Sequence, residues 1–151
     1  MITTEPATAV KCLGVERTCD LSELATVIPE GATQVDDGLG RAGIKAHDDL
    51  VVLYQALGGT RFQLLIGRPT ESGTADGLVA FSTPKGPTAV TMHVGPYEQL
   101  GEVAHAMVEW CGSNSRIPTG YSWETYHHLE NPDEPSTYQT TVRWALRDSD
   151  D

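Results

Sequence analysis

The order of hydrophobic patterns between residues 90 and 146 constrains the fold most strongly. Residues 90–94 alternate apolar and polar side chains as a strand does, whereas the apolar residues of Glu98–Cys111 recur at intervals of three and four, which is typical of a helix with one buried side. Two further alternating segments follow, at Tyr121–Leu129 and Tyr138–Leu146. A strand, a helix and two strands in succession indicate a β-α-β-β unit, in which the helix packs on one face of the sheet.

The first half of the chain has the same order of patterns. Val10–Glu16 predicts a strand, and apolar residues continue at helical spacing from Leu21 to Leu39, with Pro29 as a first-turn residue of a second helical segment. Two predicted strands follow: Leu50–Gln55, which is apolar and β-branched, and Arg61–Ile66, whose apolar residues alternate. Gly58-Gly59 lies between them and predicts a hairpin turn. This half is therefore also predicted to be β-α-β-β.

These patterns predict an α+β fold that is a duplicated β-α-β-β module with pseudo-twofold symmetry. A chain of 151 residues with 39% hydrophobic content is sufficient for one domain, 1–151, with repeats at about 9–67 and 78–146. Each repeat would cover one sheet face with its helix, so we expect a central ligand cleft between the free faces of two antiparallel sheet halves. The ends, 1–8 and 147–151, have little to bury and are expected to be mobile.

Composition argues against several classes of partner. The net charge of −11, from 21 acidic and 10 basic residues, does not favour a nucleic-acid-binding surface, which needs clustered Lys and Arg. The sequence has no apolar run of membrane-spanning length and no signal-peptide pattern at its start, so we expect no membrane association. Cys12, Cys19 and Cys111 lack the paired spacing of a zinc or redox site, which favours a reducing, cytoplasmic location.

Glu124 is an acidic residue inside an aromatic strand, between Trp123 and Tyr126. It is in phase with Ser122 and Tyr126, so these three side chains share one strand face, whereas Trp123 and Thr125 point to the other. Two interpretations are open: a solvent-facing glutamate at a sheet edge, or a carboxylate in an aromatic cleft. In a cleft, the group would either take up a proton or be neutralised by a cationic ligand.

The motifs Val94-Gly95-Pro96-Tyr97-Glu98 and Trp123-Glu124-Thr125-Tyr126, with the helix between them, resemble the GyrI-like, or AraC-type effector-binding, superfamily. The resemblance covers nearly the whole chain and is strongest from Val90 to Leu146. It implies a duplicated β-α-β-β domain whose central pocket binds drug-like, often cationic and aromatic molecules through a strand glutamate flanked by aromatic residues. Some members hydrolyse cyclopropane-containing toxins, and others are fused to regulators or bind DNA gyrase.

Several aromatic residues are candidate pocket walls. Tyr97 follows a Gly-Pro turn at the start of the helix, and Tyr126 and Tyr54 occupy comparable places in the two halves, while Tyr138 begins the neighbouring strand. For Trp123, strand parity favours the core, whereas the resemblance favours a pocket wall.

No metal site or cofactor is expected. His127 and His128 are adjacent and would point to opposite faces of a strand, and no acidic or Cys partner stands at a ligand spacing from them. Val52 occupies the position in the first half that Glu124 has in the second, so any cation site would contain one acid without a symmetric twin.

The leading hypothesis is a small-molecule-binding protein, in multidrug or toxin sensing or sequestration, with Glu124 as the anionic anchor. A cofactor-independent hydrolase is the alternative, in which Glu124 acts as a general base and Tyr97 or Tyr126 donates a hydrogen bond to the developing oxyanion. A third hypothesis is a protein-interaction module such as a gyrase inhibitor. No helix-turn-helix pattern accompanies the domain, so a regulatory role would require a separate DNA-binding partner.

Overall fold

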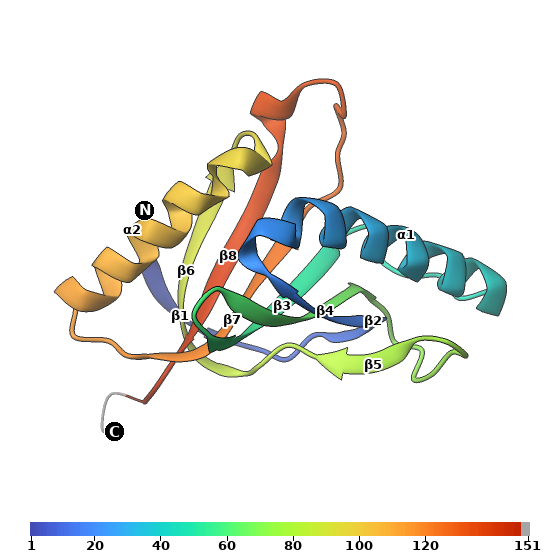
Figure 1. The fold of residues 1–151 in the computed structure, drawn as a ribbon, viewed down its shortest axis with the longest axis horizontal. Helices are drawn as coiled ribbons and strands as arrows, with labels where there is room; N and C mark the ends of the chain where they lie inside the picture. The colour runs from blue at the N-terminus through green and yellow to red at the C-terminus, as the bar shows by residue number, and fades with distance from the viewer. Residues whose placement is uncertain (149–151) are drawn as a thin grey trace.

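A computed structural model describes residues 1–148, which form one eight-stranded sheet and two long helices (Figure 1). The predicted α+β class is confirmed. The strands are β1 (Thr3–Ala7), β2 (Lys11–Asp20), β3 (Leu50–Gly58), β4 (Arg61–Pro69), β5 (Val79–Ser82), β6 (Gly86–Val94), β7 (Pro118–Tyr126) and β8 (Gln139–Leu146). The helices are α1 (Leu24–Ala42) and α2 (Leu100–Ser113), with short 3-10 turns η1 (Leu21–Glu23), η2 (Tyr97–Gln99) and η3 (Pro135–Thr137).

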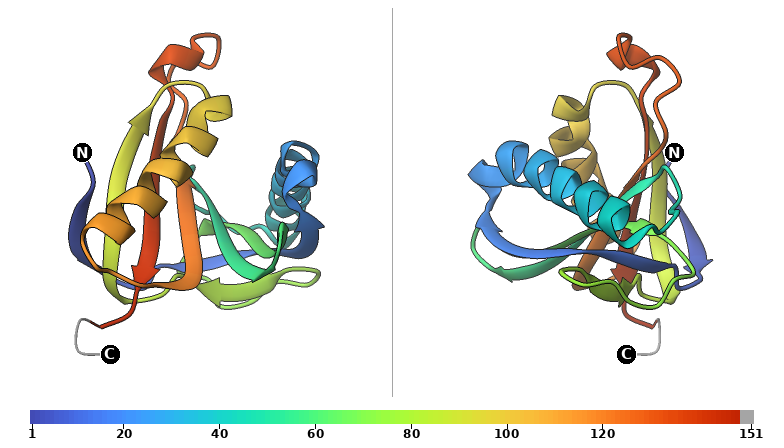
Figure 2. Two further views of the ribbon diagram at one scale, coloured as in Figure 1. Left: turned by 60° about the vertical axis from the view of Figure 1, so that its left-hand side comes forward. Right: turned by 90° about the vertical axis from the view of Figure 1, so that its right-hand side faces the viewer.

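The sheet is antiparallel throughout, in the order β1-β6-β8-β7-β3-β4-β2-β5. The segments β2-α1-β3-β4 and β6-α2-β7-β8 have the same element order, and their strands lie in mirrored order on the two sides of the β3–β7 pair. At this central pair, Val52 lies directly opposite Glu124. Figure 2 shows the two halves of the curved sheet, each with its own helix.

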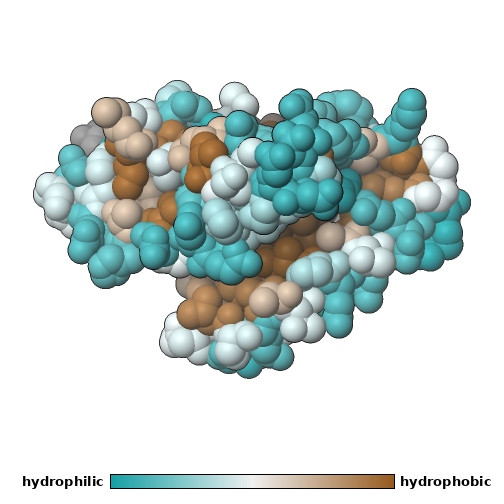
Figure 3. Space-filling view, turned by 90° about the horizontal axis from the view of Figure 1, so that it is seen from above, coloured by the Kyte–Doolittle hydropathy of each residue, from teal (hydrophilic) through white to brown (hydrophobic). Residues whose placement is uncertain are grey.

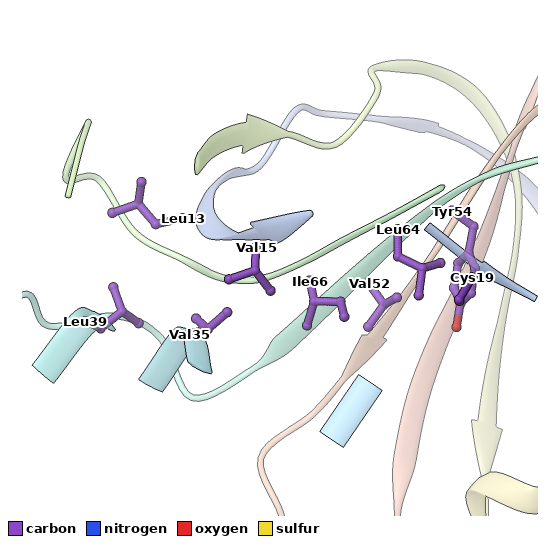
Figure 4. Packing of buried hydrophobic residues seen from close by; sticks show 9 residues of the cluster. All are labelled: Leu13, Val15, Cys19, Val35, Leu39, Val52, Tyr54, Leu64 and Ile66. Atoms are coloured by element: carbon purple, nitrogen blue, oxygen red, sulfur yellow. The ribbon is translucent and has the colours of Figure 1, made fainter. Parts of the chain in front are cut away.

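Both helices pack on the same face of the sheet. Under α1, the buried side chains of Val35 and Leu39 contact a cluster that includes Val15, Val52 and Ile66 (Figure 4). Under α2, a second cluster is composed of Ala89, Met107, Cys111, Val142 and Leu146. The helices begin near the centre of the molecule and run outward in opposite directions (Figure 1), so their first turns face each other above the middle of the sheet.

The N-terminal segment does not match the prediction of a mobile end. Thr3–Ala7 pairs with β6 as an edge strand, from Thr3 opposite Val90 to Ala7 opposite Gly86. Backbone hydrogen bonds do not depend on hydrophobic side chains, so this polar segment gives no pattern that predicts a strand. At the other end, part of the predicted mobile tail, 149–151, lies outside the described residues.

The expected break at Pro29 is also wrong, because α1 is one continuous helix with the proline inside it. Pro29 lacks an N–H, so it cannot bond to the carbonyl one turn earlier, but it lies on an exposed side of the helix. The helix is held elsewhere: Asp20 and Glu23 form a capping box on the leading turn, and Gly43 ends α1 in the left-handed conformation at φ 67°. Neither helix in the described part of the chain is both long and apolar enough to span a lipid bilayer.

Candidate ligand-binding site

A cavity of about 800 Å³ opens on the helix-bearing face, between the first turns of the two helices. This position differs from the expected cleft between the free sheet faces, because both helices lie on one face and separate above the β3–β7 pair. The volume falls within the range of ligand pockets, roughly 300–1,000 Å³. Its apolar lining comes from η1 and α1 (Leu21, Leu24, Ala25, Ile28, Pro29), β3 (Leu50), α2 (Leu100) and the segment after β7 (Leu129).

Seen from above the view of Figure 1, the surface contains an apolar hollow bordered by polar side chains (Figure 3). Aromatic walls of the cavity are supplied by Tyr97 of η2 and Tyr126 at the end of β7. The cavity thus combines aliphatic and aromatic surface, which suits an apolar or aromatic ligand.

Glu124 lies in the middle of the helix-bearing face. Directly opposed residues on neighbouring strands form one row across the sheet, and side chains in such a row share a face. The row is Thr91, Val142, Glu124, Val52, Ile66 and Val15. Glu124 is therefore a carboxyl group between the apolar clusters under α1 and α2, rather than a charge at a sheet edge.

Burial and three neighbouring side chains shift the pKa of this carboxyl group. Burial raises the pKa of Glu124 above its ordinary value, and this effect outweighs hydrogen bonding by Tyr54 and Tyr126 and the charge of His93, all of which lower it. The Tyr126 hydroxyl donates to Glu124 Oε1 at 3.2 Å. Glu124 is not among the residues that line the cavity, so Tyr126 connects it to the cavity wall.

The predicted tyrosines form one contiguous cluster. Tyr97 packs edge-on against Tyr126, with ring centroids 5.0 Å apart and an angle of 80° between the ring planes. Tyr97 also contacts Tyr138, with ring centroids 4.9 Å apart and an angle of 32° between the planes. The backbone N–H of Gly95 donates to the Tyr138 carbonyl at 2.8 Å, which holds the Gly-Pro-Tyr turn beside β8.

Tyr54 completes the cluster from the neighbouring strand. It is buried, and burial together with the nearby Glu124 and Tyr126 raises its pKa well above the ordinary tyrosine value. Its ring packs edge-on against Phe62 at 5.9 Å. The structure therefore brings five of the six predicted residues together, namely Glu124, Tyr54, Tyr97, Tyr126 and Tyr138.

Trp123, the sixth, lies on the opposite face of the sheet. Only 3% of its surface is exposed, and it packs in a cluster with Cys12, Val51, Leu53 and Ala145. Its position follows from the two-residue periodicity of a strand, which separates it from Glu124, and no register shift lies between these two residues in the pairing with β8. Trp123 is thus part of the core rather than a wall of the cavity.

Comparison with known proteins supports this architecture at the level of the fold. No protein-family model matches the chain, and no curated protein sequence matches it. Solved structures do match. The C-terminal domain of EcmrR is 13% identical over 97% of each chain, with a TM-score of 0.75. SAV2435 bound to tetraphenylphosphonium is 11% identical over 97% of this chain and 94% of that one, with a TM-score of 0.68.

A third structure is described as a hydrolase encoded by lin2189 from Listeria innocua; it is 12% identical over 97% of this chain and 91% of that one, with a TM-score of 0.58. The chain therefore has the same fold as these three proteins. At these identities the similarity establishes the arrangement of elements and leaves the ligand to be argued from this chain's own residues.

Polar residues that were not predicted to bind a ligand also line the cavity. They are Asp48, Arg68, Glu98, His127 and His128. Asp48 lies just before β3 and Arg68 lies near the end of β4, so the two residues are brought together only by the pairing of these strands. Glu98 directly follows Tyr97, and this position in the Gly-Pro-Tyr motif is the sequence signal that could have indicated it.

Histidines near the cavity and the tyrosine cluster contact neighbouring acidic or backbone groups. His127 Nδ1 lies 3.4 Å from Asp49 Oδ2, and His93 Nε2 lies 3.1 Å from the Pro96 carbonyl oxygen. Within residues 1–148, no three His, Cys, Asp or Glu side chains are grouped so that they could hold a metal ion.

Proposed function

We propose that this protein binds cationic, aromatic small molecules in the cavity between α1 and α2, with Glu124 as the anionic anchor. The observation that carries the proposal is the position of this carboxyl group, in an apolar row below the cavity and hydrogen-bonded to a tyrosine that lines it. Burial disfavours the charged carboxylate. A cation in the cavity would favour that charge again, because opposite charges attract strongly where water is excluded.

The tyrosine cluster supports the same ligand class. A cation above an aromatic face gains roughly 0.5–2 kcal/mol, depending on desolvation. Tyr97 and Tyr126 both line the cavity, with Tyr138 and Tyr54 behind them. SAV2435, which shares the fold, is seen bound to tetraphenylphosphonium, an aromatic cation. Such a protein would sense or sequester these compounds. The three free, buried cysteines fit a cytoplasmic location, because thiols stay reduced there.

The two halves contribute unequally to this site. We propose that they are copies of one ancestral β-α-β-β module, because their element order and mirrored strand order agree. Val52 faces Glu124 across the central pair, so only one half supplies the acid. The cation would therefore lie on the β7 side of the cavity, near Tyr97 and Tyr126.

Titration of the wild-type protein and an E124Q variant with a panel of aromatic cations tests the proposal. Intrinsic fluorescence and thermal shift report binding, and E102Q is the matched control, since Glu102 is exposed on α2 and does not line the cavity. Saturable binding that weakens in E124Q and not in E102Q is expected. Equal affinity in wild type, E124Q and E102Q would show that Glu124 does not contribute to binding.

Hydrolysis is the second candidate, and the observation that favours it is the position of the Glu124 carboxyl group, which the hydrogen bond from Tyr126 holds below the cavity. A carboxyl group with a raised pKa is a better general base near neutral pH than an ordinary one. Glu124 would take a proton from water while the water oxygen bonds to an electrophilic ring carbon. The strained ring bond breaks, its electron pair moves to a conjugated oxygen, and Tyr97 donates a hydrogen bond to that oxygen. The resulting enolate would then take the proton back from Glu124, which regenerates the carboxylate and completes the addition of one water molecule.

Mass spectrometry of each compound after incubation separates the two functions. A binder returns its ligands intact, whereas a hydrolase returns products heavier by one water molecule. If hydrolysis occurs, loss of the product in both E124Q and Tyr97→Phe is expected, and persistence of the product in E124Q would contradict the assigned base.

A further inference from the structure

Glu98 is an exposed carboxylate on the rim of the cavity. It lies in η2, directly after Tyr97, and it lines the cavity. Among residues 1–148, no side chain forms an ion pair or hydrogen bond with its carboxylate under ordinary distance limits. The rim thus carries a negative charge that the protein itself does not neutralise.

The cationic groups nearest the cavity are already occupied. Arg68 makes a two-point contact with Asp36, at 2.6 and 3.1 Å, and donates a further bond of 2.6 Å to the Asp48 carbonyl oxygen. His128 lies 3.7 Å from the Asp48 carboxylate. Two acidic groups therefore lie at different depths: Glu124 below the tyrosines, hydrogen-bonded by Tyr126, and Glu98 at the rim, without an ion-pair partner among residues 1–148.

We propose that the cavity is built for elongated dications, in which one cationic aromatic group approaches Glu124 and a second meets Glu98. This inference rests on the proposed function and adds a second contact to it. The cavity of about 800 Å³ lies toward the upper end of ligand pockets and leaves room for a spacer between the two groups. Leu21, Leu24 and Ile28 form an aliphatic wall that such a spacer would contact.

An alternative explanation for the position of Glu98 is that its carboxylate stabilises α2 by complementing the partial positive charge at the start of the helix. Glu102 is the residue that separates the two explanations, since it lies in the first turn of the same helix, is also exposed, and does not line the cavity. E98Q and E102Q change the net charge equally. Only E98Q removes a carboxylate from the cavity.

The experiment compares a bis-quinolinium compound, whose two rings are joined by an alkyl chain, with a mono-quinolinium compound carrying the same chain. A series of chain lengths allows for the separation of the two acids. Isothermal titration calorimetry gives both affinities for wild type, E98Q and E102Q at low salt. The measured quantity is the ratio of dication to monocation affinity, because the tethered second group binds at a high effective concentration.

At the best chain length, we expect the ratio in wild type to exceed the statistical factor of two for a symmetric ligand. E98Q should lower it by about 1.4- to 5-fold, the range for exposed ion pairs, and E102Q should leave it unchanged. Equal ratios in E98Q and E102Q would overturn this inference, while E124Q-sensitive monocation binding would leave the proposed function intact. If neither compound binds at any chain length, both proposals fall.

Discussion

The Tyr126 hydroxyl donates a hydrogen bond to Glu124 Oε1 at 3.2 Å, between two residues on the same face of one strand. The ring of Tyr126 lines the cavity, whereas the carboxyl group lies below it. In the proposed function, a ligand that contacts the ring would act on the carboxyl group through this hydrogen bond. This pair links the packing of the sheet to the chemistry of the cavity.

Stability should depend on pH through Glu124. Burial raises its pKa in the native state, so the native protein keeps this proton to a higher pH than the unfolded chain does. The free energy of unfolding should therefore fall as pH rises from the ordinary value of 4.5 through the raised native pKa. E124Q lacks this titration and should gain stability relative to wild type over that interval. Denaturant unfolding at several pH values measures the difference, and a constant difference would contradict the assignment.

Tyr126→Phe should retain the ring packing against Tyr97 and lose the donor to Glu124. Removal of one hydrogen bond is expected to lower the free energy of unfolding by about 0.5–1.5 kcal/mol. The pKa of Glu124 should rise further, so the pH interval of the stability change should move upward. Tyr121→Phe, at a partly exposed tyrosine on the same strand outside the cluster, is the control. An interval that does not move would show that the hydroxyl has no influence on the carboxyl group.

Trp123→Phe should weaken the fold without altering the site. The indole is 3% exposed on the face opposite the cavity, so truncation leaves space in the core. We expect a loss of stability on the order of 1–3 kcal/mol, below the 3–5 kcal/mol typical of Trp→Ala. Affinity of the folded protein for an aromatic cation should stay within about twofold. A large loss of affinity in a fully folded Trp123→Phe variant would contradict the assignment of Trp123 to the core and would favour a position in the cavity wall.

Ala25→Trp should block the cavity from the α1 side. Ala25 is exposed and lines the cavity, whereas Thr26 is exposed and does not. The added indole would occupy ligand space in the first variant only, so Thr26→Trp controls for an added aromatic on the same helix. Calorimetric titration should give at least tenfold weaker cation binding in Ala25→Trp and little change in Thr26→Trp. Equal affinities would mean that ligands bind elsewhere.

Side-chain periodicity predicted the elements that bury an apolar face. The helix at Glu98–Cys111 and the strands of both halves have such faces, so α2, β3, β4 and β8 match their predicted positions closely. The β1 strand did not, because it is held by backbone pairing with β6 and by contacts such as the 2.9 Å bond from Arg143 to Glu5. Hydrogen bonds between segments far apart in the chain leave no local pattern.

The candidate site was likewise predictable only in part from the sequence. Strand parity placed Glu124 and Tyr126 on one face, and the structure joins them by a hydrogen bond. The location of the cavity was not predictable, because it depends on the helices' packing on one face and separating above the sheet. Asp48 and Arg68 meet at the cavity only through the pairing of β3 with β4, so no single segment indicates them.

The affinities of wild type and E124Q for tetraphenylphosphonium at neutral pH measure whether Glu124 takes part in recognising a cation. Isothermal titration calorimetry, with E102Q as the charge-matched control, should show one saturable site in wild type and E102Q. We expect at least tenfold weaker binding in E124Q, since the carboxyl group that would carry the charge opposite the cation is lost. Unchanged affinity in folded E124Q would contradict the proposed function, because the carboxyl group below the cavity would then have no part in recognising the cation.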